Sequence, residues 1–165
     1  MKGIKLILLL LALALPVLIF VFLKFFGKNE FTVEPLFAEG APVVAGCPEF
    51  PQGQYYIPAE ILNRFGWSLA DSLTVIFTAD TKTERLTFSD RLHEEFSEHE
   101  VRILKPEGIP ADSLQQLRTC YFFLNKPYDL LLVDNQQRIR GQYHAASREE
   151  VDRLLVEAKI ILKKY

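Results

Sequence analysis

The sequence has few cysteines and lacks the short motifs that mark many enzyme classes. Cys47 and Cys120 are its only two cysteines, too few for a disulfide-built scaffold, and they form no C-x-x-C pair. The eight glycines are scattered, and no phosphate-binding loop, dinucleotide fingerprint or G-x-S-x-G sequence occurs. The sequence therefore does not indicate a nucleotide-dependent enzyme or a hydrolase of these classes.

Positive charge is scarce as well. The first 28 residues contain four lysines and no acidic residue, which leaves 15 basic and 21 acidic residues for the rest of the chain. Proteins that bind nucleic acids concentrate positive charge on one surface. We therefore expect no nucleic-acid partner.

The apolar residues are concentrated near the N-terminus, where Leu6 to Leu23 form 18 consecutive residues without a charge. At 1.5 Å per residue a helix of this length spans about 27 Å, close to the roughly 30 Å hydrocarbon core of a bilayer. We expect residues 1–28 to be an uncleaved, single-pass transmembrane anchor with the C-terminal domain on the extracytoplasmic side. A soluble cytoplasmic enzyme is disfavoured.

Two other fates of the N-terminal region stay open. Ala12-Leu13-Ala14 has the form of a signal-peptidase site, although cleavage there would leave apolar residues 16–26 at a new N-terminus. Val44-Ala45-Gly46-Cys47 matches a lipobox by letter, but it lies more than twenty residues beyond the apolar run. We favour the intact anchor over both.

The remainder divides into a linker and a domain. Residues 29–54 are interrupted too often for a long helix or strand, by Gly40, Pro42, Gly46, Pro48, Pro51 and Gly53. We interpret residues 29–54 as an extracytoplasmic tether and residues 55–165 as the folded domain.

Strand and helix patterns alternate through this domain. β-Branched and apolar runs predict strands, and apolar residues spaced by three and four predict helices. The strands are expected at 73–79, 101–104, 128–133 and 138–143, and the helices at 83–99, from Pro110 through Leu117, and after Ser147. This order predicts an α/β, thioredoxin-like sandwich in which flanking helices cover a central mixed sheet.

The last helix carries the clearest local signal. Ser147 and Glu150 form an S-x-x-E capping box. One apolar face follows, made by Val151, Leu154, Leu155, Ala158, Ile161 and Leu162. Ahead of the third strand, Pro127 lies where thioredoxin-like folds place a cis-proline, and an ordinary trans bond is the alternative.

Several segments together resemble the Sco/SenC family. These are Leu132-Val133-Asp134, the stretch Arg138 to Tyr143, the helix Glu149 to Leu154, Tyr56-Ile57-Pro58 and the strand ending Phe77-Thr78, in similar order after an N-terminal anchor. Members of that family are membrane-anchored, thioredoxin-fold copper chaperones and thiol reductases that serve cytochrome c oxidase assembly. The resemblance implies a location in the cytoplasmic (inner) membrane with the domain facing the periplasm.

The chain departs from the family at its reactive positions. Where the family has a C-x-x-x-C pair after the first core strand, this chain has Asp80 and Glu84. The family's third copper ligand is a histidine ahead of the apolar strand, where this chain has Asn125-Lys126-Pro127. The family's copper and thiol chemistry therefore cannot be transferred to this site, and we expect no cofactor.

The remaining candidate residues each allow more than one interpretation. Asp80 and Glu84 could bind a hard cation, but acidic residues at a helix start more often serve capping and the helix dipole. Cys47 and Cys120 could form a structural disulfide in an oxidising compartment, or both could be unpaired.

A possible partner surface is formed by Arg138, Arg140, Tyr143 and His144. Because side chains alternate along a strand, we expect both arginines on one face while Ile139 points inward, with Tyr143 and His144 exposed beside them. Arginine and tyrosine are enriched at interfaces. Ordinary solvated charges on an edge strand are the alternative.

These observations predict a non-catalytic, membrane-tethered protein that binds a membrane or periplasmic protein partner during respiratory oxidase biogenesis. The alternative is a redox or copper-handling protein whose chemistry has moved to Cys47 and Cys120.

Overall fold

The computed structural model describes residues 2–26, 31–78 and 82–163. It divides the chain into two compact units, Met1–Phe31 and Thr32–Tyr165. The first unit contains one described helix, α1 (Lys2–Phe26). Across the described ranges, no helix combines the length and the hydropathy that crossing a membrane requires.

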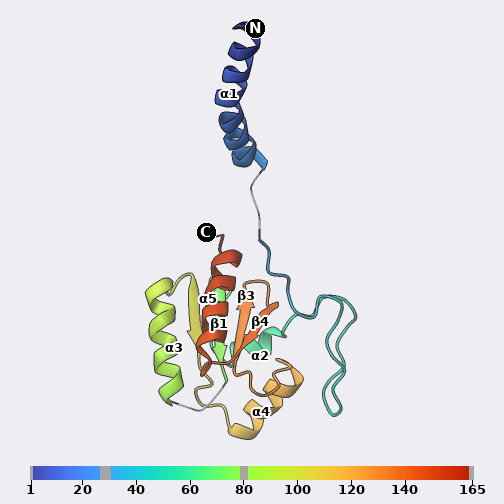
Figure 1. Ribbon diagram of the computed structural model, residues 1–165. Coiled ribbons are helices and arrows are strands. Elements are labelled where there is room, and N and C mark those ends of the chain that lie inside the picture. The colour runs from blue at the N-terminus through green and yellow to red at the C-terminus, as the bar shows by residue number, and fades with distance from the viewer. Residues whose placement is uncertain (1, 27–30, 79–81, 164–165) are drawn as a thin grey trace. The chain divides into compact units, whose positions relative to one another are not determined.

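The second unit is a mixed α/β structure built on a four-stranded sheet in the order β2-β1-β3-β4 (Figure 1). β1 pairs in parallel with β2 and antiparallel with β3, and β3 pairs antiparallel with β4. The strands are β1 (Leu73–Phe77), β2 (Val101–Leu104), β3 (Leu130–Asp134) and β4 (Ile139–Tyr143).

Helices cover both faces of this sheet. Side chains of α3 and α5 form one core with one face, and side chains of α2 and α4 contribute to the core on the other face (Figure 1). The helices are α2 (Ala59–Asn63), α3 (Lys82–Glu95), α4 (Ala111–Cys120) and α5 (Arg148–Ile161). The strands and helices expected from residue 73 onward are confirmed, with ends displaced by a few residues, and α2 is an addition.

The burial of the two central strands, β1 and β3, explains their largely apolar sequences. All residues of β1 and of β3 are buried. Since alternate side chains point to opposite faces, Val75 enters the core with α3 and α5, and Ile76 enters the core with α2 and α4. Strands covered on both faces need a continuous apolar run rather than an alternating pattern.

The start of α5 confirms Ser147 as the N-cap, which is one half of the expected capping box, whereas the Ser147 N–H donates to the carbonyl oxygen of His144. The Oγ atom of Ser147 accepts a hydrogen bond from the backbone N–H of Glu150 at 3.3 Å. The apolar face that follows is buried at Val151, Leu154, Leu155 and Ala158. Ahead of β3, the Lys126–Pro127 peptide bond is cis, one of the two isomers that the sequence leaves open.

Residues 29–54 differ from the separate tether that we expected, because from Thr32 onward they belong to the same compact unit as the sheet. The side chains of Leu36, Phe37 and Phe50 pack against the core that contains α2 and α4. The physical reason is that α2 is only five residues long. Aromatic and aliphatic side chains from this segment therefore cover the sheet face that the helices leave open.

β4 contains a bulge at Arg140. Leu132 of β3 pairs with Gly141, but the next residue, Val133, pairs with Ile139, which leaves Arg140 without a counterpart. An extra residue changes the face to which the following side chains point. Ile139 therefore enters the core with α2 and α4, whereas Tyr143 enters the core with α3 and α5.

The ring of Tyr143 lies directly over Gly141. A Cβ atom added at Gly141 would lie 2.0 Å from the Oη atom and 2.4 Å from the Cζ atom of Tyr143. Since no real Cβ contact is that short, glycine is required here for the ring to take its place in the core.

We predict that Gly141→Ala lowers the free energy of unfolding by about 1–3 kcal/mol, because the Tyr143 ring must leave a well-packed position. Urea unfolding of the second unit, residues 32–165, measures this. The same substitution in a Tyr143→Ala background should cost much less, because the clashing side chain is gone. An equal cost in both backgrounds would show that the clash is not the cause.

Candidate functional site

The end of β1 is where the Sco/SenC resemblance places the reactive residues. Asp80 lies outside the described residues, and Glu84 lies in α3 with a side chain that also falls outside the description. Within the described ranges, no three or more His, Cys, Asp or Glu side chains are grouped to hold a metal ion. At this end of the sheet the structure describes the contacts of Thr78, Arg118, Tyr128 and Asp129.

Those residues form a buried polar cluster that joins α4 to the ends of β1 and β3. The Nη1 atom of Arg118 donates to the Oγ1 atom of Thr78 at 2.5 Å and to its carbonyl oxygen at 3.3 Å. The Nη2 atom donates to the carbonyl oxygen of Tyr128 at 2.9 Å. Thr78 in turn donates from its hydroxyl to the carbonyl oxygen of Asp129 at 2.9 Å.

The carboxylate of Asp129 extends this cluster toward the start of α5. Asp129 is only 6% exposed, and its Oδ1 atom accepts a hydrogen bond from the backbone N–H of Ala145 at 2.7 Å. Its Oδ2 atom lies 3.5 Å from Nδ1 of His144. One buried carboxylate thus orients the chain where β4 turns toward α5.

The electrostatics of Arg118 follow from its position. Burial lowers the pKa of the guanidinium, and the nearby negative charge of Asp129 opposes that change. The guanidinium donors of Arg118 point to main-chain oxygens of Thr78 and Tyr128 and to the Thr78 hydroxyl. The arrangement is suited to fixing strand ends, and the cluster contains no thiol.

The two cysteines lie together elsewhere in the domain. A disulfide joins Cys47 to Cys120, with 5.2 Å between their Cα atoms and a sequence separation of 73. Cys120 ends α4 and is 4% exposed, whereas Cys47 is half-buried. The structure thus contains the disulfide, one of the two arrangements that the sequence leaves open.

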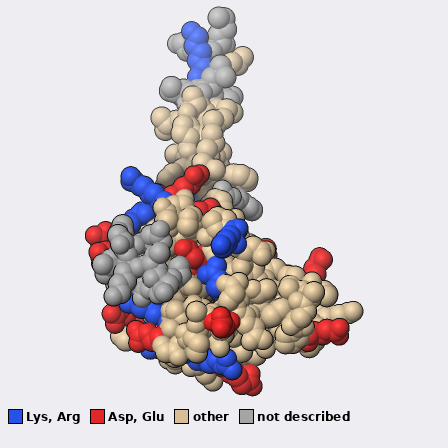
Figure 2. All heavy atoms as spheres, turned by 90° about the horizontal axis from the view of Figure 1, so that it is seen from below, with Lys and Arg blue, Asp and Glu red and all other residues tan. Residues whose placement is uncertain are grey.

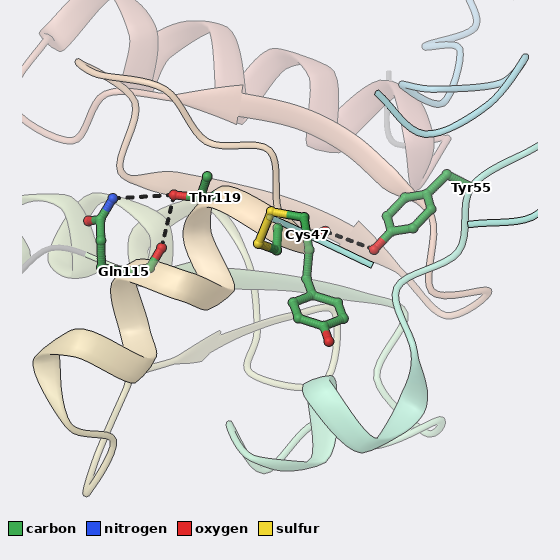
Figure 3. Close-up of a disulfide and its surroundings, with 6 residues drawn as sticks. Cys47, Tyr55, Gln115 and Thr119 are labelled. Carbon is green, nitrogen blue, oxygen red and sulfur yellow. Dashed lines mark hydrogen bonds between the residues drawn. A yellow bond between two sulfur atoms is a disulfide. The ribbon is translucent and has the colours of Figure 1, made fainter. Parts of the chain in front are cut away.

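Figure 3 shows the surroundings of this disulfide, with Gln115 and Thr119 on the same helix as Cys120. Tyr55 donates from its hydroxyl to the carbonyl oxygen of Tyr121 at 2.9 Å. Burial raises the pKa of the Tyr55 hydroxyl. Edge-to-face aromatic contacts add to the cluster, among Phe37, Phe50, Tyr55, Tyr121 and Phe123.

These contacts make the disulfide a structural staple. Closing a chain segment of this length restricts the unfolded state and is typically worth about 2–4 kcal/mol. The staple holds residues near Cys47 against α4, the same helix that carries Arg118.

The arginines of the expected partner surface bind a carboxylate of their own domain. Asp134 is 3% exposed. Its Oδ2 atom accepts hydrogen bonds from Nε of Arg138 at 2.8 Å and from Nη1 of Arg140 at 3.1 Å. Arg140 also donates from Nη2 to the carbonyl oxygen of Val33. A buried carboxylate needs such compensation, so these arginines are engaged within the fold.

The expectation that Tyr143 is exposed is wrong. Tyr143 is 0% exposed because the bulge at Arg140 turns it into the core. Its hydroxyl donates to Glu157, and the Arg153 guanidinium lies 4.6 Å from its ring centre. The side chain of His144 keeps 31% of its surface exposed. The four residues therefore do not form the exposed surface that we expected.

Sequence reasoning missed Arg118, Asp129 and Asp134, which organise the polar contacts of the domain. Asp134 could have been recognised, because an aspartate opening a turn accepts hydrogen bonds from the following backbone N–H groups. Here its Oδ1 atom accepts from the N–H groups of Gln136 and Arg138. Arg118 and Asp129 have no comparable local pattern, since their partners lie far away in sequence.

We predict that Arg118→Ala lowers the free energy of unfolding by about 2–3 kcal/mol, because buried acceptors on Thr78 and Tyr128 lose a charged donor. Arg118→Lys should recover only part of this, since an ammonium group lacks the planar fork that reaches both residues. Arg64→Ala, at an exposed arginine, should change stability by less than about 0.5 kcal/mol. Similar losses of unfolding free energy in Arg118→Ala and Arg64→Ala would show that the hydrogen bonds of Arg118 do not stabilise the domain.

Burial raises the pKa of the Tyr143 hydroxyl above its usual 10.0, and the hydrogen bond to Glu157 adds to the rise. In the unfolded chain the same hydroxyl ionises near pH 10, so its contribution to stability is present below pH 10 and is lost as the pH rises further. We predict that Tyr143→Phe makes the alkaline decline in stability shallower by up to about 1.4 kcal/mol per pH unit. Urea unfolding between pH 9 and 11.5 measures this, and parallel curves would contradict it.

Comparison of the chain with models of protein families, with curated proteins and with solved structures found no significant match. The resemblance to Sco/SenC proteins therefore rests on the sequence segments quoted above.

Proposed function

We propose that this protein is a membrane-tethered, extracytoplasmic module of thioredoxin-like fold that binds a protein partner during respiratory oxidase biogenesis. In this role the domain supplies a surface, while the thiol and copper chemistry of the Sco/SenC proteins belongs to other molecules.

The thioredoxin-like assignment is supported by the connectivity of the sheet. The elements from β1 to α5 follow in the order strand, helix, strand, helix, strand, strand, helix. In the sheet order β2-β1-β3-β4, β1 and β2 are parallel. β3 is antiparallel to β1, and β4 is antiparallel to β3. This is the arrangement that the thioredoxin-like sandwich requires.

The single observation that carries the binding role is the disulfide. The chain has only two cysteines, and both are used to staple residues near Cys47 to α4. Neither cysteine lies directly after β1, where the resemblance places the reactive pair. A domain whose two thiols are joined in a structural disulfide is suited to recognition rather than to thiol chemistry.

The membrane tether and its compartment are supported by two features. The run Leu6 to Leu23 is long enough to span a bilayer by sequence. In α1, described apolar side chains such as Leu13 and Phe20 are 74% and 69% exposed. A disulfide is also typical of proteins outside the reducing cytoplasm. The oxidase connection rests on the resemblance alone.

One observation favours a second candidate, in which Cys47 and Cys120 carry redox or copper chemistry. Cys47 is half-buried, so this end of the disulfide is more accessible than Cys120, which is 4% exposed. The two candidates differ in what loss of the thiols does to function, as opposed to stability.

We predict that the full chain, purified from membranes, contains no free thiol before reduction, two thiols after reduction, and no stoichiometric copper or zinc. In cells that lack the protein, a Cys47→Ser/Cys120→Ser variant should restore oxidase activity in proportion to the amount of variant that accumulates. Gly141→Ala is the matched control, because it lowers stability while both cysteines remain.

Two outcomes would overturn this function in favour of the redox alternative. The first is stoichiometric copper that disappears from the double serine variant. The second is a double serine variant that accumulates as well as the wild type and yet fails to support oxidase activity, while Gly141→Ala at equal abundance supports it.

A further inference from the structure

One loop of the second unit is both exposed and firmly attached. We call residues 39–53 the stapled loop. An antiparallel bridge between Gly40 and Gln52 closes its base, and the disulfide to Cys120 fixes its outer part. The Phe50 ring adds an edge contact with Tyr55 at 4.9 Å between ring centres. Figure 1 shows this loop extending from the side of the domain.

The stapled loop combines this attachment with partial packing, because Ala41, Val44 and Phe50 pack against the core that contains α2 and α4. The two limbs of the stapled loop enclose a hollow of about 600 Å³ that residues from both limbs line. A turn within the loop is closed by a hydrogen bond from the N–H of Cys47 to the carbonyl oxygen of Val44 at 3.1 Å. The shape of the loop therefore depends on its closed base, on the disulfide and on these partial core contacts. Because the loop is already ordered, less conformational entropy is lost when a partner binds.

The tip of this loop is apolar. It reads Ala41-Pro42-Val43-Val44-Ala45-Gly46, and Val43 is 95% exposed. A single exposed apolar side chain is common on protein surfaces. Here Ala41 and Val44 pack partly against the core, while Val43 points away from it on a cross-linked support, so the free domain gains no burial from Val43.

The charge around the tip has one sign. The exposed side chains of Glu39 and Glu49 flank it, and no lysine or arginine occurs between residues 29 and 63. In Figure 2 the side of the domain that carries the loop is tan and red without blue. Carboxylates beside an apolar tip disfavour insertion among anionic lipid headgroups and favour a surface with positive charge.

We infer that the stapled loop is the docking surface of this protein, and that its partner is a protein with an apolar pocket for Val43 bordered by lysine or arginine side chains. This inference deepens the proposed binding role and rests on it. Binding places Val43 in the pocket while Glu39 and Glu49 pair with the basic rim. The preformed loop supplies shape, and the carboxylates select partners by charge.

A second copy of this chain is the competitor that the test must separate. Its domain has an apolar hollow of about 320 Å³ with Arg91 and Arg148 at the rim. Both arginines, however, contact the carboxylate of Asp152 within the same domain. Asp152 offsets part of the charge of both arginines, so an external partner with a basic rim that is not paired in this way is the better match for the acidic flanks.

The test uses the full chain in its own membranes, with the photocrosslinking residue p-benzoylphenylalanine at position 43. Controls carry the same residue at position 69 or 156, where Leu69 and Val156 are 72% and 57% exposed. We expect a discrete protein adduct from position 43 alone, with the linked peptide of the partner next to lysine or arginine. Glu39→Lys/Glu49→Lys should lower the adduct yield at least fivefold, whereas Glu60→Lys, an exposed charge reversal outside the loop, should leave it unchanged.

Each other outcome overturns the inference in a distinguishable way. An adduct twice the mass of the chain would identify a second copy, and a lipid adduct would identify the membrane surface. A protein adduct from position 69 or 156 but not from 43 would place the docking surface elsewhere and leave the proposed binding role standing. No adduct from any position would count against both, provided that the variants accumulate normally and contain the disulfide.

Discussion

The burial of β1 and β3 on both faces is the constraint on which the rest of the second unit depends. Two strands with every residue covered require two separate cores, and each core must be closed by elements from other parts of the chain. α3 and α5 are long enough to close one of them. The other is closed jointly by two shorter helices and by residues that precede the first strand, which brings Cys47 within bonding distance of α4.

The polar contacts of the domain follow from the same constraint. Chain ends of fully buried strands carry backbone and side-chain groups that must find partners inside the protein. Asp129 precedes β3 and Asp134 ends it, and both carboxylates are almost completely buried. Asp134 is satisfied by two arginines and by turn N–H groups, and Asp129 accepts from the start of the α5 region. Charged residues that look like surface features in the sequence are therefore internal partners.

Much of the fold could be predicted from the sequence, because its signals are local. The apolar run of β1, the spacing of Phe88, Leu92 and Phe96, and the capping residue Ser147 each act within one element. The burial of Tyr143 could not be predicted, because it depends on one extra residue at Arg140 that changes the face of everything after it. A strict alternation of faces is valid only for an unbroken ladder.

The candidate site was less predictable than the fold. The disulfide was one of two open alternatives, because two cysteines 73 residues apart give no local signal of their distance in space. The density of proline and glycine in residues 29–54 indicated a linker, and it concealed aromatic side chains such as Phe37 and Phe50 that belong to the core. Their contacts are long-range, so only the folded structure brings them together.

The segment that leads into the domain also protects one edge of the sheet. Leu36 donates from its backbone N–H to the carbonyl oxygen of Ile139 at 2.7 Å, and Arg140 holds the carbonyl oxygen of Val33. β4 is an edge strand, and an uncovered edge is a template for pairing with another molecule. A chain shortened to begin at residue 55 would keep every strand of the sheet but would uncover this edge. Residues 33–36 thus act as a guard against edge-to-edge aggregation, a duty separate from any they have as a connection.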